Sequence, residues 1–150
     1  MAKEDKKLKV RIFMEVLGWP EEALTEHLKK IIVKLKKQWK ILNEHYETPV
    51  KLENMEKMFT SHVEFEAEVP NFNDLVAFCL SFGPSVVEIL EPSYIHLTAG
   101  DMQDMLSDMI SKIQIMDKEI KVLAAQKKIL DTQLNEIQPK KHSKDDNIKI

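Results

Sequence analysis

The sequence of 150 residues holds few glycines, cysteines and arginines, and each scarcity excludes a class of function. Its three glycines, Gly18, Gly83 and Gly100, lie too far apart to form a phosphate-binding loop. The single cysteine, Cys79, excludes an internal disulfide and a zinc site of paired cysteines, so we expect a reducing compartment, the cytoplasm. No apolar run approaches the ~20 residues that cross a membrane. The lysine-rich start leads into an alternating segment, which is not typical of a secretory signal.

Arginine occurs once, at Arg11, among 22 basic residues. The guanidinium group forms paired hydrogen bonds to guanine bases and to phosphates. With a single arginine, a protein that recognises a specific nucleic-acid sequence is disfavoured. The net charge of −3 is unevenly distributed. Residues 1–40 carry eleven basic and six acidic side chains, residues 41–100 carry two and ten, and residues 101–150 carry nine of each. This asymmetry indicates a surface for a partner more than it indicates a fold.

Short periodic patterns fill the sequence up to residue 97. Period-2 alternation predicts strands over residues 8–16 and 59–69, each with one apolar face. Residues rich in β-forming side chains predict further strands over 39–47 and 85–91, and residues 94–97 can extend the last of them. The stretch between the second and third strands is expected to be a connection, with room for one helical turn.

Two helices separate these strands. The first begins near Pro20, with acidic residues in its first turn and lysines at its end. The second is short, capped by Asn71 or Asn73 and ended by Gly83-Pro84. The order β-α-β-β-α-β over residues 8–97 predicts an α+β domain with a ferredoxin-like antiparallel sheet and both helices on one face.

Residues 98–138 form a different pattern, a heptad repeat. Thr98 and Asp101 fit a capping box, and no Pro or Gly follows Gly100 until Pro139. A helix of about 54 Å is too long to bury its apolar stripe on a domain of 90 residues, so we expect a coiled coil. The charged segment 139–150 is expected to be disordered. The predicted oligomer interface consists of the a and d positions Met102, Leu106, Met109, Ile113, Met116, Ile120, Leu123, Lys127, Leu130, Leu134 and Ile137.

The polar a position, Lys127, bears on the direction of pairing. In a parallel dimer in register it would face its own copy. An antiparallel register that opposes Ile113 with Leu123 instead places Lys127 beside Met109, where a thioether packs against the lysine stem. We therefore hypothesise an antiparallel dimer. A second stripe of three apolar residues at c positions hints at a larger bundle or a partner helix; these are Ile115, Val122 and Ile129.

No set of residues predicts catalysis, a cofactor or a metal. His45 and His62 fall on strands that pair, but no third metal ligand is evident. Cys79 lies on the apolar side of the second helix, where an inert thiol is expected. The outward carboxylates of the third strand, Glu64, Glu66 and Glu68, are interpreted as solvated surface. A lysine run that resembles a polyanion patch is interpreted as a solvated helix face; it comprises Lys29, Lys30, Lys34, Lys36, Lys37 and Lys40.

The run LSFGPSVVEILEP, residues 80–92, resembles the last helix–strand corner of the C-terminal extension domain of WYL-type bacterial regulators. It is also similar to ACT-like regulatory modules, which dimerise and bind effectors. The resemblance covers about a dozen residues and implies a ferredoxin-like fold. Neither a WYL domain nor a helix-turn-helix accompanies it, so no ligand residue is carried over.

We therefore expect a non-enzymatic protein that forms homo-oligomers through its coiled coil, with no membrane association. One alternative is a regulatory domain that senses a small molecule at the sheet or between heads. The other is a nucleic-acid accessory protein that uses the lysine face.

Overall fold

The computed structural model describes residues 7–138 of the chain. It contains two compact units, Met1–Met105 and Leu106–Ile150. The first holds an α+β domain, here called the head, and the second holds most of a long helix.

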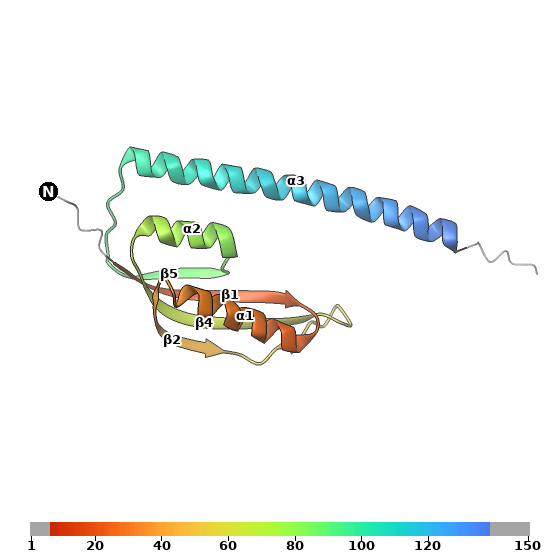
Figure 1. The fold of residues 1–150 in the computed structure, drawn as a ribbon, viewed down its shortest axis with the longest axis horizontal. Coiled ribbons are helices and arrows are strands. Elements are labelled where there is room, and N and C mark those ends of the chain that lie inside the picture. Colours follow the sequence, from red (N-terminus) through yellow and green to blue (C-terminus); the bar gives the residue numbers. More distant parts are fainter. Residues whose placement is uncertain (1–6, 139–150) are drawn as a thin grey trace, which may run out of the picture. The chain divides into compact units, whose positions relative to one another are not determined.

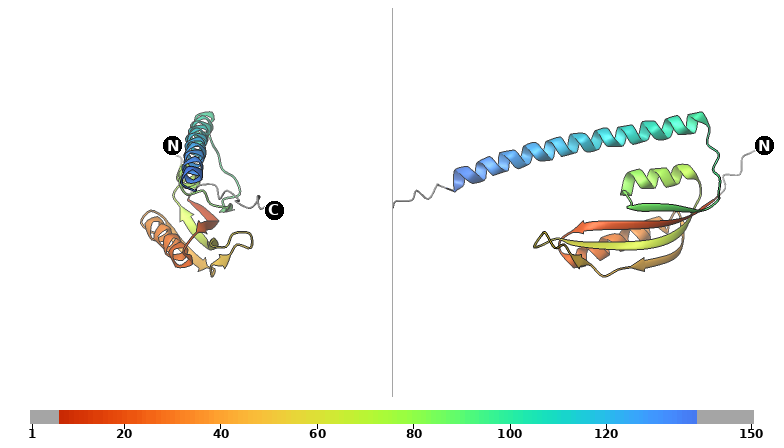
Figure 2. Two further views of the ribbon diagram at one scale, coloured as in Figure 1. Left: turned by 90° about the vertical axis from the view of Figure 1, so that its right-hand side faces the viewer. Right: turned by 180° about the vertical axis from the view of Figure 1, so that it is seen from behind.

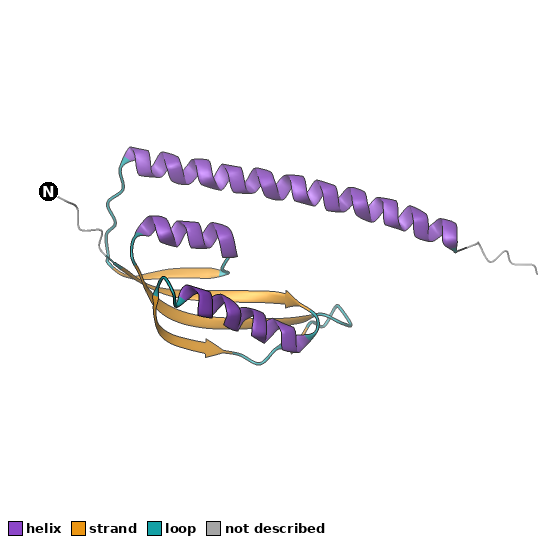
Figure 3. Ribbon diagram, viewed as in Figure 1, coloured by secondary structure: helices purple, strands orange, loops and turns teal. Residues whose placement is uncertain are grey.

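The head is built on an antiparallel sheet of five strands (Figure 1, Figure 3). The long strands β1 (Leu8–Gly18) and β4 (Phe59–Val69) pair along their whole length at its centre. The edges are β2 (Lys40–Tyr46), which pairs with β4, and β5 (Val86–Glu91), which pairs with β1. The order is β2-β4-β1-β5, and the two-residue strand β3 (Val50–Lys51) also pairs with β4.

The alternation seen in the sequence places one apolar face of the sheet in the core. On β1 the residues from Leu8 to Met14 that lie at even positions are buried, and on β4 the odd positions from Ser61 to Val69 are buried. The register sets Ile12 opposite Phe65, so the two rows meet across the central pair of strands. Since side chains alternate along a strand, the even positions of β4 are left on the opposite, open face.

Two helices contribute to the same core. Helix α1 (Glu21–Leu35) buries five residues spaced three and four apart, and α2 (Phe72–Phe82) buries Leu75 and Phe78. The ring of Phe78 lies 4.9 Å from that of Trp39, which is also in the core. Asn71 caps α2 by accepting a hydrogen bond from the backbone N–H of Asp74, and Gly83 ends the helix in the left-handed region at φ 57°.

Helix α3 (Ala99–Ile137) runs unbroken for 39 residues, about 58 Å at the rise of an α-helix. Its N-terminus is a reciprocal capping box. The Asp101 carboxylate accepts from the Thr98 N–H at 2.8 Å, and Thr98 Oγ1 accepts from the Asp101 N–H at 3.1 Å. None of its residues is buried in the part of the chain that the structure describes.

The α+β class, the antiparallel sheet and the long C-terminal helix were predicted correctly, and three details were not. The expected connection between the second and third strands contains β3, because β4 is longer than β2 and its first residues pair with Val50 and Lys51. Trp39 precedes β2, and its ring packs in the core. Residues 94–97 form no strand, and the expected disordered segment 139–150 lies outside the described residues.

Candidate interaction surfaces

The open face of the sheet is one of three surfaces that can contact a partner, and Figure 2 shows it in the right-hand view, from the side opposite α1. It carries the odd positions of β1 and the even positions of β4, so charged side chains from neighbouring strands lie side by side. Lys40 Nζ lies 3.6 Å from Glu68, and Thr60 donates to Glu15 at 2.6 Å.

Arg11 lies at the centre of this face and contacts carboxylates from both neighbouring strands. Its guanidinium lies 3.4 Å from Glu64 and 2.9 Å from Glu66 on β4, and 3.0 Å from Glu88 on β5. The hydrogen bond to Glu66 raises the pKa of Arg11 above its ordinary value. Guanidinium has five N–H donors in a planar fork, so one side chain can serve three acceptors. The arrangement links β4, β1 and β5.

The three carboxylates exceed the charge of the guanidinium, so the cluster is acidic as a whole. A shallow depression of about 350 Å³ lies beside it, lined by Arg11, Phe13, Glu64, Val86 and Glu88. The one cation that could hold an anionic ligand there, Arg11, already contacts these carboxylates. The depression therefore lacks a free group to orient an anionic ligand.

The two candidate histidines have different surroundings. His62 Nε2 lies 2.8 Å from Glu47, and its ring lies 4.9 Å from that of Phe13. His45 is opposite Glu64 in the β2–β4 register, so the two histidines are not paired across the strands. Among the described residues, no three His, Cys, Asp or Glu side chains form a group that could hold a metal ion.

Cys79 lies on α2 and packs against the core while partly exposed. Burial raises the pKa of its thiol, which lowers the fraction of reactive thiolate. This environment is typical of an inert cysteine.

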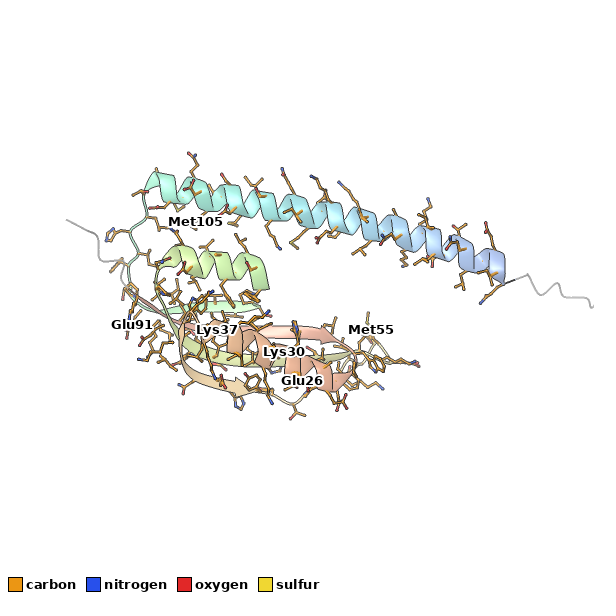
Figure 4. The ribbon with its side chains drawn as sticks, viewed as in Figure 1. Glu26, Lys30, Lys37, Met55, Glu91 and Met105 are labelled. Carbon is orange, nitrogen blue, oxygen red and sulfur yellow. The ribbon has the colours of Figure 1, made fainter. Side chains whose placement is uncertain are left out.

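The second surface is the lysine run of residues 29–40, which begins on the exposed side of α1 and continues into the turn after it; Figure 4 labels Lys30 on the helix and Lys37 in the turn. Other members of the run already have partners within the chain. Lys36 Nζ lies 2.9 Å from Glu44, and Lys29 Nζ lies 5.8 Å from the centre of the Tyr46 ring. The positive charge that a polyanion would meet is therefore smaller than the sequence run indicates.

The third surface is the apolar stripe of α3. The apolar a and d residues of the predicted interface all lie on this helix, with exposed fractions from 42% at Met109 to 76% at Ile137. The three c-position residues are exposed to a similar degree, from 51% at Ile115 to 57% at Ile129. A continuous apolar stripe of this length on one helix is typical of a surface that another helix covers.

Sequence reasoning missed the role of Arg11 as the link between strands. Its outward position on the first strand was evident from alternation. The signal that could have found its partners was the predicted βαββαβ order, which makes the first strand central and gives it an acidic neighbour on either side.

Within residues 7–138, no helix combines the length and the apolar composition needed to cross a membrane.

Comparison with known proteins returned one family and one relative. The sequence model of the MJ0538 family matches residues 9–149. A protein of Methanocaldococcus jannaschii, named uncharacterized protein MJ0538, is 26% identical over 104 residues. That alignment covers 69% of this chain and 40% of the relative, so the chain spans about two fifths of the relative's length. No solved structure matches the chain.

Proposed function

The chain belongs to the MJ0538 family, and we propose that it is a non-enzymatic scaffold whose copies assemble through α3. In this proposal α3 forms a coiled coil with other copies, and each copy carries a ferredoxin-like head. The function is the assembly itself and the display of several heads on one particle.

The observation that carries the proposal is the contrast between the apolar stripe of α3 and its surroundings. Ten apolar side chains recur at a and d positions, none of them is buried among the described residues, and the helix is unbroken over 39 residues. Most helical stability in proteins comes from packing of an apolar face, and each fully buried Leu or Ile adds roughly 1.5–3 kcal/mol. A partner helix would supply that packing along the whole stripe.

The ferredoxin-like interpretation of the head is supported by its strand order, β2-β4-β1-β5, and by antiparallel pairing throughout. Setting aside β3, the elements follow the order β-α-β-β-α-β along the chain. The two helices share one core on one face of the sheet.

The two alternatives have less support. A small-molecule sensor would use the depression beside Arg11, where the guanidinium is held by three carboxylates. A nucleic-acid accessory protein would use the lysine run of residues 29–40, but Lys36 pairs with Glu44 of β2, and Lys40 pairs with Glu68 on the open face of the sheet.

The proposal is tested by placing charges in the stripe. In the double variant Ile120→Asp/Leu123→Asp, two carboxylates enter adjacent a and d layers, so we expect the assembly to fall to the 17.5 kDa mass of one chain. Light scattering coupled to size exclusion measures the mass. The fluorescence of Trp39, buried in the head, reports whether the head stays folded; it is measured in a Trp19→Phe background, because Trp19 is exposed and would add its own signal.

The matched control carries two Asp residues on the outer side of α3, Ser111→Asp/Ala125→Asp, and should keep the wild-type mass. A wild-type chain that has the mass of one copy at micromolar concentration would contradict the proposal.

A further inference from the structure

The outer edge of β5 is an unpaired edge of the sheet in the head (Figure 1). β5 is the last strand in the order β2-β4-β1-β5, and in the described part of the chain no strand pairs with its outer side. Its pairing with β1 is regular from Val86 to Ile89, so the backbone there is extended. The side chains of Val86 and Ile89 are 57% and 37% exposed. An edge of this kind is a template to which a further strand can be added.

The opposite edge of the sheet, β2, is less suited to a further strand. Its register with β4 shifts between Ile41 and Asn43, its first residue is Lys40, and its apolar side chains are partly buried. Irregular pairing and lysine side chains are features that keep another strand from joining an edge. β5 has the sequence VVEILE, which contains neither lysine nor proline. We therefore look to β5 for strand addition.

The two sides of β5 favour different side chains on an added strand. Val87 and Ile89 pair with core residues of β1, whereas Glu88 pairs with Arg11 on the open face of the sheet. Side chains alternate along a strand and contact those of the neighbouring strand on the same face. An added strand would therefore place apolar side chains beside Val87 and Ile89, and the residue between them beside Glu88.

The open face beside β5 has an excess of negative charge. Glu88 shares the guanidinium of Arg11 with Glu64 and Glu66, so three carboxylates surround one cation. The side chains of Glu64 and Glu88 are 51% and 55% exposed, and the shallow depression that they line also has Phe13 in its wall. This surface fits a lysine or arginine whose stem lies on apolar side chains and whose charge lies near the carboxylates.

We propose that the outer edge of β5 binds an extended segment of another protein in which apolar residues alternate with lysine or arginine. The segment would join the sheet as a strand beside β5, with its apolar side chains next to Val87 and Ile89 and a basic side chain next to Glu88. The inference concerns the head alone and does not depend on assembly through α3.

Strand β1 shows the same pattern on the inner edge of β5. Lys9 and Arg11, with Val10 between them, lie opposite Glu91 and Glu88. The charges of β5 also argue against a second copy of this strand at the outer edge, because a second copy would bring its own two glutamates there. A basic segment neutralises the glutamates, and opposite charges across neighbouring strands are stabilising.

The test measures binding of two fluorescent peptides to the full chain by fluorescence anisotropy. One peptide of ten residues alternates valine and lysine. The control peptide has the same composition but carries its valines and lysines in pairs, which places lysine on both faces of a strand. We expect saturable binding of the alternating peptide and binding weaker by about tenfold for the control. Equal affinity for the two peptides would overturn the inference.

Charge variants locate the contact at Glu88. Glu88→Lys should weaken binding of the alternating peptide by about tenfold, and the milder Glu88→Gln by about threefold. The matched control Glu26→Lys, at an exposed position of α1, changes the charge equally and should keep the wild-type affinity (Figure 4). Trp39 fluorescence in the Trp19→Phe background shows that each variant is folded. A folded Glu88 variant with wild-type affinity would overturn the inference.

Amide hydrogen exchange distinguishes strand addition from contact through side chains alone. Bound peptide should slow exchange in residues 86–91 of β5 and leave residues 40–46 of β2 unchanged. Binding without slower exchange in β5 would overturn the inference. Protection of β5 that rises with protein concentration in the absence of peptide would show that a second copy occupies the edge, and would also overturn it.

Discussion

The head and helix α3 use apolar residues in opposite ways. In the head, strands β1 and β4 and helices α1 and α2 bury their apolar faces against one another within one chain. In α3 the apolar residues are as regular as those of β1 and β4, yet none is buried among the described residues. The difference teaches that sequence periodicity locates the apolar face of an element. It does not show whether another segment of the same chain packs against that face.

This difference has a thermodynamic consequence. Burial within one chain gives a stability that does not depend on protein concentration. Burial between chains makes stability depend on concentration through mass action. Three predictions test whether the stability of the head and the stability of α3 respond independently of each other.

The largest effect is expected from Phe65→Ala, which removes a side chain that is 1% exposed at the centre of the head. Loss of a buried phenylalanine costs about 3–5 kcal/mol of unfolding free energy. Urea denaturation followed by Trp39 fluorescence should show this loss, while the helical signal of α3 in circular dichroism keeps its own midpoint. Val33→Ala, at an exposed position of α1, should change the head by less than about 0.5 kcal/mol. Simultaneous loss of both signals would show that the two regions unfold as one.

An intermediate effect is expected from Lys127→Leu, which replaces the polar residue of the apolar stripe. If Lys127 lies in the apolar contact between copies, the added apolar side chain should stabilise the assembly by about 1–2 kcal/mol per chain. The helical signal should persist to higher urea and lower protein concentration, with no change in the Trp39 midpoint. Lys128→Leu changes an adjacent outward residue and should give no gain. Equal gains for both variants would contradict the assignment of Lys127 to the interface.

The smallest effect is a decline in the stability of the head at alkaline pH. Burial raises the pKa of both Cys79 and Tyr46, so the folded head keeps protons that the unfolded chain releases. Stability is then complete below the ordinary pKa of the thiol, about 8.5, and falls as the pH rises above it. Helix α3 contains neither residue type.

Denaturation by urea from pH 7 to pH 10 should therefore lower the Trp39 midpoint. The double variant Cys79→Ser/Tyr46→Phe should flatten this decline. A decline of the same size in the double variant would show that other groups cause it.

The sequence predicted those elements in which a periodic pattern of apolar residues is bounded by residues that begin or end a helix or strand. The strand that becomes β4 alternates for eleven residues and ends before Pro70, and α2 has Asn71 at one end and Gly83 at the other. For α3, the capping box of Thr98 and Asp101 and the heptad repeat identify the start, the type and the length. In each case a local signal and a long-range requirement point to the same structure.

Other features depend on contacts that a local pattern does not contain. Strand β3 has two residues and exists because β4 extends beyond β2. Trp39 has strong β-propensity, but the core between α1 and α2 holds its ring. The contact of Arg11 with Glu88 joins residues 77 positions apart and needs the strand order to be known. These are properties of the folded arrangement and not of any short segment.

The position of β1 at the centre of the sheet also sets the order of events during synthesis. This strand is synthesised before its partners, so its pairing with β4 waits until Val69 has emerged from the ribosome and its pairing with β5 waits until Glu91 has emerged. Helix α3 follows, after every strand of the head is available. In the proposed assembly, neighbouring nascent chains would therefore present every strand of their heads before they present the helix that joins them.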